Sequence, residues 1–147
     1  MFSFFIIKQK GYKMKLFKSI LLLACAFTLS FGEDYKELNS KTMIGMESGL
    51  SNIQKGFLYN NLELVKYGAE QIKAENKIYH ERKVIKEILP KGKQQMENIA
   101  LITSNRIDNA IEELTTYVTL KDMRKAHDAF TDIVKACTDC HNIVRGW

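Results

Sequence analysis

Residues 123–145 read MRKAHDAFTDIVKACTDCHNIVR, and this segment decides how the chain is interpreted. Its apolar side chains recur every three or four positions, which is the spacing of one face of an α-helix. Asp122 precedes the segment, where a negative charge favours the start of a helix. We therefore predict one amphipathic helix. The stripe consists of Met123, Ala126, Phe130, Ile133, Val134 and Cys137.

The helix is predicted to carry a reactive motif near its end, Cys137-Thr138-Asp139-Cys140-His141. Residues i and i+3 of a helix lie on one face, so both thiols can add to the two vinyl groups at one edge of a porphyrin. The next residue, His141, then lies beneath the ring, where its imidazole can bind iron. This is the attachment sequence of a c-type haem. We expect one covalently attached haem c, bound through Cys137 and Cys140, with His141 as an iron ligand.

Other proteins use two cysteines at this spacing differently. A thiol redox pair is typical of a βαβ context, and no strand pattern is visible in this chain. A zinc site needs a second pair of ligands, and only Cys25, His80 and His127 remain. These two alternatives, and a helical binding or scaffolding protein with a coincidental motif, are weaker predictions than a haem.

Residues 1–32 are predicted to be a secretory signal peptide. Met14 begins a short basic stretch and is a better start than Met1; an apolar run of twelve residues, 20–31, follows. Small residues at Ser30 and Gly32 then have the form of a cleavage site. A bilayer needs about 20 apolar residues, so no integral membrane segment is expected. We expect the mature chain, residues 33–147, to be periplasmic.

The leader also affects two other predictions. Cys25 follows Leu22-Leu23-Ala24, which partly resembles a lipoprotein motif, so its lipidation is left open. The whole chain has 22 Lys and Arg against 17 Asp and Glu, but five of the basic residues belong to the leader. The mature chain then has 17 of each, and this balance offers no support for binding nucleic acid.

The mature chain has the length of one domain and the pattern of an all-α protein. Turns are predicted at Gly56 with Asn60-Asn61, at Pro90-Lys91-Gly92 and at 119–121. Residues 76–90 either continue the second helix or form a loop with a short helix. Together with the segment already described, three more apolar stripes predict an antiparallel four-helix bundle. The stripes are Met43, Met46, Leu50, Ile53 and Phe57; Leu62, Val65, Ala69 and Ile72; and Met96, Ile99, Ala100, Thr103, Ile107, Ala110, Ile111, Leu114 and Val118.

A haem motif that closes the last of four helices, with the basic Arg145 four residues after the histidine, resembles the cytochrome c′ family. The resemblance spans residues 33–147 in length and helix order, and its specific part is the C-terminal motif. It implies a bundle built around the haem, and homodimers are common in that family. A basic residue of the first helix in many relatives is Asn39 here, which puts propionate contacts from that helix in doubt.

The resemblance also implies two functions. Members with an open sixth iron position bind NO or CO, whereas low-spin relatives use a methionine of the first helix and carry electrons. Aligning Ile53 with the family's isoleucine places Met43 at the sixth position and Met46 one turn further on. The alternatives for the sixth ligand are Met46, His80 or no side chain, and simple core packing explains both methionines equally well. His127 precedes His141 by 14 residues, about 21 Å along a helix, which excludes it from the same iron.

These observations favour an electron carrier that serves redox partner proteins, with NO or CO binding as the alternative function. Arg145 lies one turn beyond His141, where it can pair with a haem propionate, although a solvated arginine near a helix C-terminus is also common. No Ser/His/Asp arrangement, carboxylate pair or phosphate loop is visible, so we do not expect an enzyme.

Overall fold

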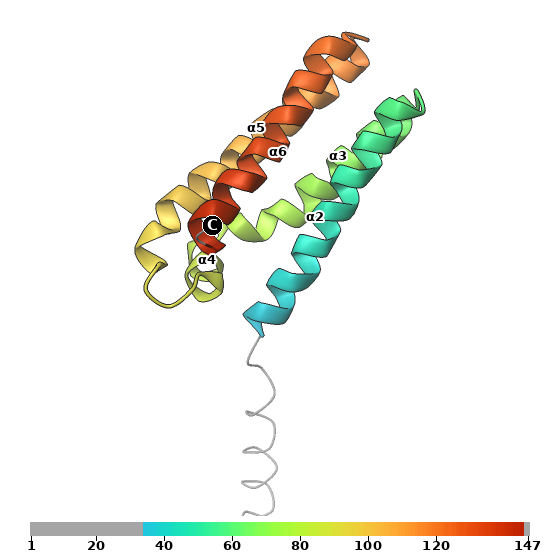
Figure 1. The fold of residues 1–147 in the computed structure, drawn as a ribbon. Coiled ribbons are helices and arrows are strands. Elements are labelled where there is room, and N and C mark those ends of the chain that lie inside the picture. Colours follow the sequence, from blue (N-terminus) through green and yellow to red (C-terminus); the bar gives the residue numbers. More distant parts are fainter. Residues whose placement is uncertain (1–33, 146–147) are drawn as a thin grey trace, which may run out of the picture. The chain divides into compact units, whose positions relative to one another are not determined.

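The computed structural model describes residues 34–145, all of whose regular structure is helical (Figure 1). The predicted signal peptide, with Met14 and Cys25, lies outside the described residues. The predicted all-α class is confirmed for this part of the chain. The elements are α2 (Tyr35–Leu58), α3 (Leu62–Asn76), the 3₁₀ helix η1 (Lys77–His80), α4 (Arg82–Ile88), the 3₁₀ helix η2 (Gln94–Met96), α5 (Glu97–Thr119) and α6 (Met123–Arg145).

The turn between α2 and α3 lies where the two asparagines predicted it. Asn60 has a φ of 52°, a left-handed conformation that asparagine tolerates better than most residues. The side chain of Asn61 accepts a hydrogen bond from the Leu64 N–H at 3.0 Å and so caps α3. Gly56, which we predicted to mark the turn together with these asparagines, is a buried residue of α2, and its carbonyl accepts a hydrogen bond from the Asn61 N–H at 2.8 Å. A Cβ there would lie 2.5 Å from Val65 Cγ2, so this glycine allows α2 and α3 to approach closely.

Residues 76–90 adopt the second of the two predicted alternatives, a loop with a short helix. α3 ends at Asn76, η1 follows, and α4 has seven residues. Leu89 has an extended backbone, as the residue before a proline usually does, and α4 stops there. α4 is therefore a fifth helix, in addition to the four expected from the stripes.

The corner between α5 and α6 is tight because Lys121 adopts a φ of 57°. The side chain of Asp122 accepts a hydrogen bond from the Lys125 N–H at 3.2 Å, which confirms its predicted place at the start of α6.

The core is apolar and draws on α2, α3, α5 and α6 together. α2 packs against α3, α5 packs against α6, and α3 packs against α5 (Figure 1). Two predicted stripe positions are exposed instead, Ile99 on α5 and Val134 on α6. No helix between residues 34 and 145 is long and apolar enough to cross a membrane. The fully buried side chains of this core include Ile53, Val65, Ile72, Ile111, Leu114, Val118 and Ile133.

Candidate functional site

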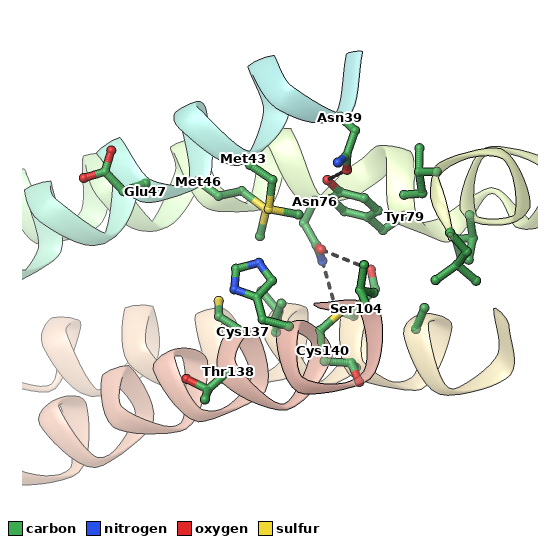
Figure 2. A pocket seen from close by; sticks show the side chains of 18 of the residues that line it. Asn39, Met43, Met46, Glu47, Asn76, Tyr79, Ser104, Cys137, Thr138 and Cys140 are labelled. Carbon is green, nitrogen blue, oxygen red and sulfur yellow. Dashed lines mark hydrogen bonds between the residues drawn. The ribbon is translucent and has the colours of Figure 1, made fainter. Parts of the chain in front are cut away.

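A largely apolar cavity of about 330 Å³ lies among the helices, with α2 and α6 forming two of its walls (Figure 2). Its volume is in the range of protein pockets that hold small ligands and cofactors. The short helix α4 contributes Ile85 and Ile88 to the wall, followed by Leu89. The cavity is therefore closed in part by the one helix that the apolar stripes did not predict.

The α6 wall carries the reactive motif. Cys137, Cys140 and His141 all line the cavity, together with Val134 one turn before them and Val144 one turn after. Counted from Cys137, Cys140, His141 and Val144 follow the i+3, i+4 and i+7 positions of a single helix face, and Val134 lies at i−3 on the same face. The motif residues that the sequence placed on one face are thus all directed at the same space.

The opposite wall is formed by α2, from which Met43 and Met46 reach into the space facing α6 (Figure 2). Met46 is buried, whereas Met43 is half-buried. Both methionines contact the apolar core or belong to it, so packing alone explains their burial. The two thiols on one wall can bond covalently to a ring that carries vinyl groups. The imidazole on the same wall is a nitrogen ligand for a metal within that ring, and the two thioethers on the other wall are soft ligands.

Of the two other candidate residues, His80 does not line this cavity, and the side chain of Arg145 is not described. His80 is not among the lining residues; its Nε2 lies 2.8 Å from Asp108 Oδ2 and 3.4 Å from the Ser104 hydroxyl. Arg145 is the last residue of α6, and the position of its side chain lies outside the described part of the structure. Among residues 34–145, no group of three or more His, Cys, Asp or Glu side chains could hold a bare metal ion.

The polar part of the wall was not predicted from the sequence. Asn76 is completely buried and lines the cavity beside Ser104. Tyr79, also on the wall, donates a hydrogen bond from its hydroxyl to Asn39 Oδ1 at 2.7 Å. One sequence signal was available: Asn76 continues the spacing of the buried Ala69 and Ile72, so a polar residue falls on an apolar face.

The turn of α6 that holds the motif is tied to α5 by one arginine. The Arg106 guanidinium makes two hydrogen bonds to the Asp132 carboxylate and a third, of 2.8 Å, to Asp139 Oδ2. Arg106 lowers the pKa of Asp132, mainly through the hydrogen bonds between them. Because Asp139 lies between the two cysteines, Arg106 connects the motif itself to α5.

The cavity keeps both thiols in their neutral form. Burial raises the pKa of Cys137 to about 11, and the nearby Cys140 contributes to the shift. Burial also raises the pKa of Cys140 and that of the Tyr79 hydroxyl. Thiolates are the reactive form of cysteine, so neither thiol is activated by its surroundings, as a thiol redox pair requires.

We expect Cys137 in the folded, haem-free chain to react slowly with iodoacetamide. With a pKa of about 11, its thiolate fraction at about pH 8 is on the order of a hundredfold below that of a free cysteine. Mass spectrometry of the labelled cysteines, in the native chain and in urea, measures the ratio, and circular dichroism checks that the native sample is folded. Equal rates in the two samples would contradict the burial of this thiol.

Comparisons of the chain with protein-family models, with curated proteins and with solved structures gave no match. The motif and the geometry of the cavity are therefore the features that bear on function.

Proposed function

We propose that this protein is a monohaem c-type cytochrome of the cytochrome c′ type, which carries electrons in the periplasm and is not an enzyme. The observation that carries the proposal is the cavity itself. Cys137, Cys140 and His141 line it from α6, and Met43 and Met46 line it from α2. In this proposal α2, α3, α5 and α6 are the four helices of an antiparallel bundle built around the haem.

The residues present fit a haem on three counts. The walls are mostly apolar, as a porphyrin ring requires, and the two thiols share a helix face at the spacing of its two vinyl groups. The ligand types suit iron: an imidazole on one side and thioethers on the other. Neither thiol forms a disulfide, so both stay available for thioether formation.

Each residue has a separate role in the proposal. Cys137 and Cys140 hold the cofactor to α6, and His141 binds the iron from the same helix. Met43 supplies the sixth ligand from α2, and Arg145 pairs with a propionate. The bound haem supplies a centre that takes up and releases one electron. Held by packed helices, His141 and Met43 would bind the iron in the same way in both oxidation states, as a carrier needs.

The proposal is tested by optical spectra of the oxidised and reduced protein and of two matched variants. We expect the ferric wild type to be low-spin, with the weak far-red band that marks a sulfur–iron bond. Met43→Ala is expected to lose this band because alanine offers no ligand, whereas Met46→Ala, one turn away on the same wall, is expected to keep it.

Two other results of this experiment would change the proposal. Loss of the band in Met46→Ala alone would move the ligand to Met46 and keep the electron carrier. A high-spin ferrous wild type that takes up CO readily would instead favour the NO- or CO-binding function.

A further inference from the structure

Four polar side chains form a closed set of contacts at the junction of α3, η1 and α5. His80 Nε2 lies 2.8 Å from Asp108 Oδ2, and Asn76 Nδ2 donates to Asp108 Oδ1 at 2.7 Å. The same Nδ2 donates to the Ser104 carbonyl at 2.9 Å, and the Ser104 hydroxyl donates to Asn76 Oδ1 at 3.1 Å. That hydroxyl also lies 3.4 Å from His80 Nε2. We call these four residues the polar network.

The polar network connects water with the cavity. At one end, 33 % of the His80 side chain and 26 % of the Asp108 side chain are exposed. At the other end, Asn76 and Ser104 are buried and line the cavity, as Figure 2 shows with their mutual hydrogen bonds. Protons can therefore reach His80 from solvent, while the dipoles and charge of the network act on whatever occupies the cavity.

The amide and hydroxyl of this network are engaged with one another, so the wall is held rigidly. Asn76 uses both its amide nitrogen and its amide oxygen within the network. A fixed arrangement of this kind reorients little when a nearby charge changes, and electrostatic interactions are stronger in a poorly hydrated interior than in water. A charge on the imidazole is consequently felt in the cavity.

We propose that the His80–Asp108 pair is a proton-binding site coupled to the electron held in the cavity. This inference rests on the proposed haem function. When a one-electron donor protein reduces the carrier, the added negative charge favours transfer of one proton from water to the His80 imidazole. When the electron leaves, that proton returns to water. Coupling of this kind is reciprocal, so protonation of His80 in turn favours reduction.

Asp108, on α5, is the charged side chain that contacts His80. On α3, Asn76 of the polar network is a neutral amide. Lys73, on the same helix, is paired with Glu112 at 3.4 Å. From α4, Arg82 is engaged by Glu97 and by Asn98. From α2, Asn39 contacts the neighbouring Tyr79 as a neutral amide.

The experiment is a spectroelectrochemical titration of the haem-loaded protein between about pH 5 and pH 8, the range in which histidines change charge. We expect the wild-type reduction potential to fall as the pH rises, because the positive charge that favours reduction is lost. His80→Gln is expected to flatten this dependence. His127→Gln is the matched control, since His127 lies against Phe57 and Phe130 and does not line the cavity.

A second variant keeps the test decisive if His80→Gln does not fold. In Asp108→Asn the imidazole loses the carboxylate that lies 2.8 Å from it, so the pH dependence of the potential is expected to differ from that of the wild type. Far-ultraviolet circular dichroism and an unchanged haem spectrum verify each variant.

A wild-type potential that does not vary with pH would overturn the inference, and so would an equal slope in wild type and His80→Gln. A changed haem spectrum in His80→Gln would place His80 on the iron and overturn it as well. Failure of the proposed haem attachment looks different, because the chain would then show no reversible one-electron couple at any pH. A gas-binding haem would be recognised by its high-spin ferrous spectrum and its uptake of CO.

Discussion

Replacement of both Cys137 and Cys140 by serine is expected to abolish covalent attachment of haem to the chain. Serine is close to cysteine in size and keeps the shape of the cavity wall, but its hydroxyl does not form a thioether with a vinyl group. The expected effect is complete loss, because no other cysteine lies among residues 34–145. The measurement is peroxidase staining of a denaturing gel after co-expression with the haem-attachment machinery.

Thr138→Ala is the matched control for this double variant. Thr138 lies between the two cysteines at the exposed edge of the cavity, and its hydroxyl donates a hydrogen bond to the Val134 carbonyl of the same helix. Its loss should leave the stain unchanged. An unstained wild-type band would contradict the haem itself, and a stained Cys137→Ser, Cys140→Ser chain would contradict the attachment through these two residues.

Gly68→Ala is expected to lower the free energy of unfolding by about 2 kcal/mol. A Cβ at Gly68 would lie 2.5 Å from the Gly49 carbonyl oxygen and 2.9 Å from the Ile53 backbone nitrogen. Because these are backbone atoms of α2, relief requires the two helices to separate. Overpacking of this kind costs about 1–3 kcal/mol, near the upper end when backbone must move. The higher helix propensity of alanine, about 1 kcal/mol, offsets only part of this cost.

Gly45→Ala provides the same substitution at a helical site where the neighbour can move. A Cβ at Gly45 would lie 2.6 Å from Glu75 Cδ and Oε1, at the far end of a flexible side chain. We expect this variant to be as stable as the wild type or more stable by up to about 1 kcal/mol. Urea unfolding followed by circular dichroism compares the two. Equal stabilities would contradict the close packing of α2 on α3, whatever the cavity holds.

Features that depend on neighbouring residues could be predicted from the sequence. The helical stripes, the Asn60-Asn61 turn and the cap at Asp122 each arise from side chains within about one helical turn of one another. The shared face of Cys137, Cys140 and His141 has the same origin. The repeat of 3.6 residues per helical turn determines this shared face, independently of how the helices pack against one another.

Features that join distant parts of the chain were harder to predict from the sequence. Gly56 was predicted to mark a turn because glycine often does, but the structure uses it for a close helix contact with Val65. His80 was one candidate for the iron, and the structure directs it to Asp108 instead. Asn76 meets Ser104 and Asp108 across 28 and 32 positions of sequence, a pairing that no local pattern reveals.

The sequence alone thus determined that this is a helical protein whose last helix presents two thiols and an imidazole on one face. Only the tertiary structure decided what that face meets: Met43 and Met46 across a cavity, α4 along its edge and a polar network in its wall. The physical reason is that helical periodicity is set by the backbone of each segment. The contents of a cavity depend instead on how separate helices pack, and that packing is the joint result of all their buried side chains.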